Sequence, residues 1–295
     1  MNAKSTSIGS AEKNLVFSIN KTYDLYHHLL LLVASVADYG RQQLELGKLK
    51  KRPTEEEKNP NTKFVDNTFI ELISKHKALN EYCDKHRLSW QQTPELAKKL
   101  YTSLLDSDYY ATYMAKVERS FEEDKTLIIR FYERELEDSE DLQALLEEQS
   151  IYWIDDLEFV LSQVIKTFKS FSQTTAPLMP LYKDADDEQF ARQLLLLAAT
   201  NSAEYQELID KHTQNWDVER IAFMDIVIMI TAIAEIVEFQ TIPIKVSLNE
   251  YIEIAKYYST PNSSIFINGV LDKVVADLKV KNMVVKTGRG LVDSR

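Results

Sequence analysis

The chain has 295 residues, 44% of them hydrophobic, and carries a formal net charge of −11. Its 6 glycines and 7 prolines lie well below average usage, which favours long secondary-structure elements. The abundance of Leu, Glu, Lys and Ala predicts that these elements are helices. The single Cys83 excludes an internal disulfide framework and a thiolate metal cage, and the acidity argues against unspecific nucleic-acid binding over the whole surface.

In the first part of the chain, apolar residues at helical spacing and capping signals predict a series of helices. Helices are expected over 11–46 and 65–86, with an exposed, charged loop over 47–63 between them. The segment 93–95 (Thr-Pro-Glu) is typical of a helix start, because it combines a capping threonine, a first-turn proline and an early acid. The segment 120–123 (Ser-Phe-Glu-Glu) is a capping box that opens a further helix.

A long helix over 151–171 completes this part. Apolar residues at spacings of three and four form one stripe along it, which must be buried: Ile154, Leu157, Leu161, Val164, Phe168 and Phe171. Residues 172–183 hold two prolines among small polar residues, which indicates a linker. We therefore expect a helical extension over 1–172, a second helical domain over 184–283 and a polar tail over 284–295.

Helix signals are sharper beyond the linker. Helices are expected over 186–212 and 218–239, and the second is apolar on most sides, as is typical of a helix at the centre of a bundle. A capping box at 247–250 (Ser-Leu-Asn-Glu) predicts the next helix start, and 260–261 (Thr-Pro) opens the last long helix.

A glycine, Gly269, lies inside the last predicted helix. Mid-helix glycine costs about 1 kcal/mol relative to alanine, so its presence requires a reason. We expect close packing against a neighbouring helix. The other interpretation is that the missing side chain lets a ligand backbone approach.

No membrane segment is expected. No basic and apolar leader follows Met1, and the longest unbroken apolar run, Ile226 to Ala234, is far shorter than the roughly 20 residues that cross a bilayer. A cytoplasmic protein is the prediction.

Three runs in the second part of the chain, VERIAFMDIVIM, IPIKVSLNEYIEIAKYYST and SSIFINGVLDK, lie between Val218 and Lys273. At this separation they resemble the C-terminal half of NusB-type transcription antitermination factors. The resemblance extends over about 186–281, and residues 11–171 are similar to the helical insertion of the family's long forms. It implies an all-α fold, a NusB-like helical bundle preceded by an additional helical region.

The resemblance also implies a function that involves neither catalysis nor a cofactor. Such factors bind a short boxA-like single-stranded RNA together with the ribosomal protein NusE. The complex joins the RNA polymerase elongation complex, suppresses early termination and supports ribosomal RNA synthesis.

Aromatic and small polar residues gather where two predicted helices meet. Single-stranded RNA is held by stacking bases on aromatic rings and by cations on the backbone. With the family match, the expected RNA-binding residues are Lys256, Tyr258, Asn262, Ser263, Phe266, Asn268 and Lys273. Taken alone, Tyr258 and Phe266 would more often be core or rim aromatics, and Lys256 and Lys273 would equally fit solvated helix charges.

A second site is implied for the protein partner. Glu219 and Arg220, at the start of the 218–239 helix, fall where the family meets NusE. Glu219 is equally explained as a first-turn acid that favours the helix dipole.

The chain departs from the family pattern at its start. Family members open with an arginine-rich stretch leading into an apolar helix, whereas here no arginine precedes Arg41. The alternative function is therefore a protein-interaction module that binds NusE or another partner without RNA. An apolar groove left by the missing helix would favour self-association, and a homodimer is a further hypothesis.

An enzyme is not expected. The histidines show no HExxH or ExxH spacing, and there is no GxSxG, P-loop or GxGxxG motif. Asp24 and His28 share a helix face, but a surface pair explains them better than a metal site.

Overall fold

The computed structural model describes residues 3–213 and 221–294, and within them every regular element is a helix. The expected all-α fold class is confirmed. The chain divides into two compact units. We call Phe17–Leu181 the extension unit, and Met1–Val16 together with Tyr182–Arg295 the C-terminal unit. No helix in the described ranges is long and apolar enough to cross a membrane.

These units differ from the predicted segments at both ends. The first residues of the chain group with the C-terminal unit, where Glu12 lies 4.0 Å from Arg192. The expected polar tail is also part of this unit, because the amide of Thr287 donates to the Gln240 carbonyl (2.9 Å) and Lys286 donates to the Phe239 carbonyl (3.0 Å).

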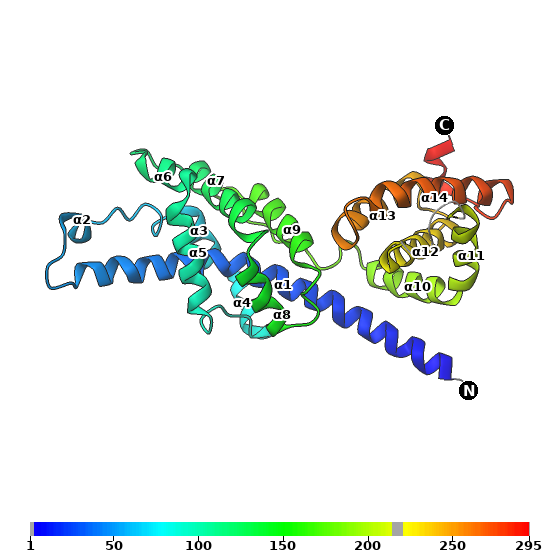
Figure 1. Cartoon of the computed structure of the whole chain (residues 1–295), viewed down its shortest axis with the longest axis horizontal. Helices are drawn as coiled ribbons and strands as arrows, with labels where there is room; N and C mark the ends of the chain where they lie inside the picture. Colours follow the sequence, from blue (N-terminus) through cyan, green and yellow to red (C-terminus); the bar gives the residue numbers. More distant parts are fainter. Residues whose placement is uncertain (1–2, 214–220, 295) are drawn as a thin grey trace. The chain divides into compact units, whose positions relative to one another are not determined.

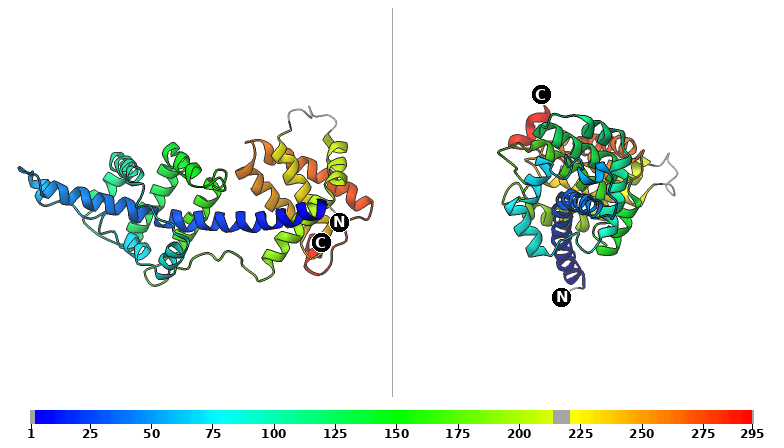
Figure 2. Two further views of the ribbon diagram at one scale, coloured as in Figure 1. Left: turned by 90° about the horizontal axis from the view of Figure 1, so that it is seen from below. Right: turned by 90° about the vertical axis from the view of Figure 1, so that its left-hand side faces the viewer.

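The extension unit is built around α1 (Ala3–Lys48), whose residues from Phe17 on belong to it. The left-hand view of Figure 2 shows α1 running between the other helices of this unit. Those are α2 (Glu55–Lys58), α3 (Thr68–Ser74), α4 (Lys77–His86), α5 (Pro94–Asp106), α6 (Asp108–Ala115), α7 (Phe121–Phe131), the π-helical η1 (Tyr132–Leu136), α8 (Glu140–Gln149) and α9 (Leu157–Ser170).

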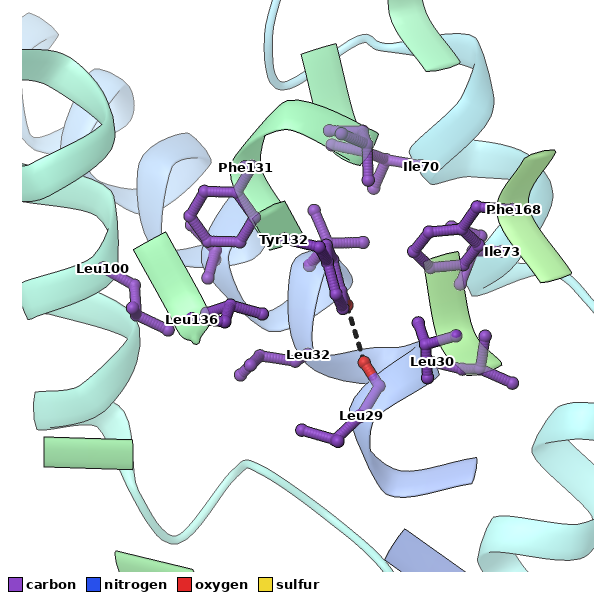
Figure 3. Packing of buried hydrophobic residues seen from close by; sticks show 14 of the residues in the cluster. Leu29, Leu30, Leu32, Ile70, Ile73, Leu100, Phe131, Tyr132, Leu136 and Phe168 are labelled. Atoms are coloured by element: carbon purple, nitrogen blue, oxygen red, sulfur yellow. Dashed lines mark hydrogen bonds between the residues drawn. The ribbon is translucent and has the colours of Figure 1, made fainter. Parts of the chain in front are cut away.

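The core of the extension unit is rich in aromatic rings. Tyr132 is fully buried and its hydroxyl donates to the Leu29 carbonyl of α1 at 2.6 Å (Figure 3). Phe131 and Phe168 pack edge-on to the Tyr132 ring, with centroids 5.8 and 5.0 Å away. This packing ties η1 and α9 to α1.

One predicted helix of this unit is divided in two. The segment expected as one helix over 65–86 forms α3 and α4, because the His76 ring accepts from the amide of Leu79 (3.2 Å) and begins a new helix. The capping serine of the 120–123 segment is confirmed, since the Glu123 amide donates to the Ser120 hydroxyl at 3.2 Å.

The C-terminal unit contains α10 (Asp187–Thr200), α11 (Ser202–Thr213), α12 (Phe223–Glu238), α13 (Ile244–Tyr258), α14 (Ser263–Val280) and the 3₁₀ segment η3 (Gly288–Ser294). The expected helix over 186–212 is divided at Asn201. As predicted for a central helix, α12 lies between α10 and α14 (Figure 1), and it buries residues such as Met229, Ala232 and Ile233 completely.

The predicted capping box at 247–250 is wrong. Helix α13 begins four residues earlier, at Ile244, with Pro243 in place of Ser247 as the residue before its first turn. Ser247 therefore lies inside the helix, fully buried, and its hydroxyl donates to the Glu235 carboxylate at 2.7 Å instead of capping. The carboxylate of Glu235, on the neighbouring helix α12, is therefore the partner of Ser247 in place of a backbone amide of its own helix.

Candidate nucleic-acid interface

The seven residues expected to bind RNA lie on the α13–α14 hairpin of the C-terminal unit. Lys256 and Tyr258 occupy the last turn of α13, and Asn262 and Ser263 begin α14. Phe266 and Asn268 follow within the next two turns. Lys273 lies further along α14, about 15 Å from its start, so the proposed surface is elongated.

A chain of side-chain hydrogen bonds fixes the turn between the two helices. Ser259 donates to the Asp225 carboxylate of α12 and lies 3.1 Å from the Ser263 hydroxyl. The Thr260 and Ser263 hydroxyls are 2.7 Å apart. Asp225 and Ser263 are both buried, so these part-buried bonds are partly shielded from water and hold the hairpin against α12.

The expected site residues divide into exposed and packed groups. Lys256, Asn262, Asn268 and Lys273 are exposed, which suits contact with a ligand. Ser263 is only 2% exposed and its hydroxyl serves the turn, so its proposed role becomes positioning the hairpin. Lys256 pairs with Glu253 on the surface, an ion pair too weak to prevent exchange for a phosphate.

The two aromatic residues of the hairpin are half-buried. Phe266 packs against the core of the C-terminal unit while part of its ring remains accessible, and Tyr258 has a similar exposure. A half-buried aromatic ring already has a restricted orientation, so little side-chain freedom is lost when it stacks on a base.

The expected partner residues Glu219 and Arg220 lie outside the described residues. Directly after them, α12 exposes large apolar side chains: Phe223 is 78% exposed, and Met224 and Val227 are 39% and 38% exposed. Sequence reasoning missed this patch, and it also missed Asp225. An acid in the first turn of an apolar helix was the available signal, but its use by Ser259 depends on tertiary packing.

The expected close packing at Gly269 is wrong. A Cβ atom added to Gly269 would meet nothing within 4 Å, so no neighbouring helix requires the glycine. It remains a glycine in an exposed helix interior, at a cost of about 1 kcal/mol relative to alanine.

A buried carboxylate and a group of ion pairs connect α13 and α14 to the neighbouring helices α12 and α11. Glu235 of α12 accepts from Ser247 and from the Tyr251 hydroxyl (2.9 Å), both on α13, and burial raises the pKa of Tyr251 well above its usual range. Between α11 and α14, Asp277 pairs with Lys211 and with His212 (3.1 Å), and hydrogen bonding from Lys211 is the main cause that lowers the pKa of Asp277.

Comparison with known proteins identifies the family. The model of the NusB family matches residues 159–276. The transcription antitermination protein NusB of Salinibacter ruber is 39% identical over 139 residues, covering 44% of this chain and 87% of that protein.

Two further NusB proteins are also similar to this chain. That of Chloroherpeton thalassium is 42% identical over 110 residues, covering 37% of this chain and 52% of its own length. That of Koribacter versatilis is 43% identical over 98 residues, covering 32% of this chain and 67% of its own. No solved structure matches the chain.

The match falls on the C-terminal region, and most of the extension unit is additional, as in a long form. The chain therefore belongs to the NusB family of transcription antitermination proteins.

Proposed function

We propose that the chain acts in antitermination by binding a boxA-like single-stranded RNA through the α13–α14 hairpin, together with NusE. The complex then joins the RNA polymerase elongation complex and supports ribosomal RNA synthesis. Because the RNA is a nascent transcript, the proposed place of action is the cytoplasm. No catalytic step or cofactor is part of this function.

The observation that supports this proposal best is the fixed turn between α13 and α14. The bond from the half-buried Ser259 to the buried Asp225 sets the angle of the hairpin before any ligand arrives. In this proposal Tyr258 and Phe266 stack on bases, while the exposed Lys256 and Lys273 contact the RNA backbone. A preformed surface loses less entropy on binding than a flexible one.

The test is fluorescence anisotropy of a labelled boxA-like RNA at several salt concentrations, with and without NusE. Each phosphate contact on single-stranded RNA contributes about −0.7 to the slope of log K against log salt. Replacing Lys256 and Lys273 by alanine should therefore flatten the slope by about 1.4. The matched control replaces Lys279 and Lys281, exposed at the far end of α14, and should leave the slope unchanged.

The aromatic contribution is tested separately with Phe266→Leu. Leucine keeps the contact with the core but removes the ring face, so affinity should fall by about tenfold, given 1–3 kcal/mol per stacked base. Equal affinity in a folded variant would remove Phe266 from the interface.

A second candidate function is a protein-docking module without RNA. The exposed Phe223, Met224 and Val227 at the start of α12 favour it, because an exposed apolar patch is typical of a protein interface. Binding of NusE with no RNA affinity at any salt concentration would select this function. Phe223→Glu should then abolish NusE binding, whereas Lys256→Ala should not.

A further inference from the structure

The extension unit leaves apolar side chains uncovered between α8 and α9. Residues 151–156 form turns and a bend there, in which Ile151 is 74% exposed and Ile154 is 48% exposed. Phe17 of α1 is 48% exposed, and its ring meets that of Tyr152 edge-on with centroids 5.1 Å apart. The expectation that Ile154 is buried with the rest of its stripe is wrong, because α9 begins only after this residue.

The backbone of this segment is held against α1. Trp153 is buried, and its indole Nε1 donates to the Lys21 carbonyl of α1 at 2.7 Å. The Asp156 carboxylate accepts from the Thr22 hydroxyl, also on α1. These contacts lie on both sides of Ile154, so the exposed side chains are presented on a preformed surface, which reduces the entropy lost on binding.

The charge around these side chains is strongly negative. Residues 133–158 contain eleven Asp or Glu and one Arg, which gives −10 in a chain whose total is −11. Glu147, Glu148 and Asp155 lie within four residues of the exposed isoleucines and are themselves exposed. In the part of the chain that the structure describes, none of these three acids forms an ion pair, so their charges are available to a partner.

Acids from the two ends of this stretch also lie near each other. Partial burial and the charge of Glu137 raise the pKa of Glu158. Like charges held together repel, and nearby cations relieve that repulsion. Among the described residues no group of acids is placed to hold a metal ion, which favours the cationic side chains of a partner.

We propose that this surface docks a protein segment that carries lysine or arginine beside apolar side chains. We call it the extension patch, made of Phe17, Glu147, Glu148, Ile151, Ile154 and Asp155. Its apolar side chains supply contact area, because burying them removes apolar surface from water. Its acids select the sign of the partner, since they attract basic side chains and repel the phosphates of nucleic acid. The inference does not depend on the α13–α14 hairpin or on the exposed start of α12.

The expected affinity is modest and depends on salt. A few exposed apolar side chains correspond to the lower end of interface sizes. Charges on an exposed surface are screened within about 8 Å at physiological ionic strength. We therefore expect a dissociation constant on the order of 10 μM at low salt, which rises as salt is added.

Fluorescence anisotropy of a designed peptide, measured with the full chain, tests the proposal. The probe is a labelled helical peptide of about 14 residues, with leucines on one face and lysines on the other. Two matched probes replace all leucines by serine or all lysines by glutamate. The peptide with both lysine and leucine should bind, loss of leucine should weaken binding at least about tenfold, and the glutamate peptide should not bind.

A substitution of an apolar residue locates the binding on the chain. Ile151→Ser should weaken binding of the lysine–leucine peptide at least about fivefold. Folding should be unaffected because Ile151 is mostly exposed, and circular dichroism checks this. The matched control is Val117→Ser, which removes a 96% exposed apolar side chain elsewhere in the extension unit and should leave binding unchanged.

A paired substitution of acids tests the charge. Glu147→Gln with Glu148→Gln should weaken peptide binding and flatten its salt dependence, because two of the attracting charges are removed. The control is Glu55→Gln with Glu56→Gln, two adjacent exposed acids on α2. It changes the net charge of the chain equally and should leave binding unchanged.

Three results would overturn the proposal. The first is no binding of the lysine–leucine peptide up to about 500 μM. The second is binding that the control variants reduce as much as the patch variants do, which would show only a general attraction to an acidic chain. The third is a loss of RNA affinity in Ile151→Ser, since that would assign the surface to RNA. Absence of RNA binding by the unaltered chain would contradict the proposed function alone.

Discussion

The two units of this chain bury different kinds of side chain. The extension unit packs aromatic rings and also buries charged or titratable groups, among them His27, His28, Lys63 and Asp124. The core of the C-terminal unit is mostly aliphatic, with Tyr205 and Tyr251 as its buried rings. The C-terminal unit also buries the carboxylates of Asp225 and Glu235, which accept from hydroxyl groups, so the units differ in their aromatic rings and in the buried histidines and lysine of the extension unit.

The largest expected difference between the units comes from Lys63. Its ammonium group is buried and donates to the carbonyls of Tyr113 (2.8 Å), Lys116 (2.9 Å) and Glu118 (3.1 Å). Lys63→Met leaves these acceptors without a donor and should destabilise the extension unit by about 3 kcal/mol or more.

Chemical denaturation in a Trp216→Phe background measures this loss, because the remaining Trp90 and Trp153 are buried in the extension unit. Lys77→Met, which removes an exposed lysine, is the control and should change stability by less than about 0.5 kcal/mol. A stability loss of that small size for Lys63→Met would show that water replaces the ammonium group without cost.

The second difference is in the response to acid. Burial lowers the pKa of His27 and of His28 to about 4. The unfolded chain binds these protons near pH 6.5, so their contribution to stability is complete above that pH and is lost as the pH falls toward 4. Each histidine could contribute up to about 3 kcal/mol of this loss.

In the C-terminal unit the corresponding group is Asp277, whose pKa is lowered. Its contribution is present above the usual range of an aspartate and is lost only as the pH falls below that range. Tryptophan-monitored unfolding at several pH values between 7 and 4 should therefore show a falling midpoint for the extension unit. A midpoint independent of pH over this interval would contradict the neutral, buried state of both histidines.

The smallest expected effect is a pair of glycine substitutions with opposite signs. Gly269→Ala should stabilise the C-terminal unit by about 1 kcal/mol, because the new methyl group enters open space and alanine favours helix. Gly40→Ala in α1 should destabilise the extension unit by about 1–3 kcal/mol, because its Cβ would lie 2.7 Å from the Tyr101 ring. Differential scanning calorimetry of the two variants at low concentration tests both signs, and a shared sign would refute the assigned environments.

Helix positions and the α13–α14 hairpin could be predicted because their signals are local. Thr260-Pro261 lies just before α14 and predicts it, whereas the capping box at 247–250 placed the start of α13 too late. The role of Ser247 was mistaken because its partner, Glu235, is reached only through tertiary packing. The environment of Gly269 was mistaken for the same reason, since sequence shows the missing side chain but not the empty space beside it.

The RNA site stays a prediction, and the structure adds the exposure of each proposed residue. Lys256, Asn262, Asn268 and Lys273 are exposed, as a ligand requires, but Ser263 is turned inward. Asp225 was not recognised, because a first-turn acid signals a helix start, whereas its bond to Ser259 depends on tertiary packing.

The grouping of Met1–Val16 with Tyr182–Arg295 makes the C-terminal unit discontinuous along the chain. All of Phe17–Leu181 is then a loop between its two parts, and closing such a loop through an unfolded chain would cost about 4 kcal/mol or more of entropy. A folded extension unit removes much of that cost by fixing the ends of the loop. During synthesis, the segment containing α1 must therefore wait for α10 to emerge before the contact between Glu12 and Arg192 can form.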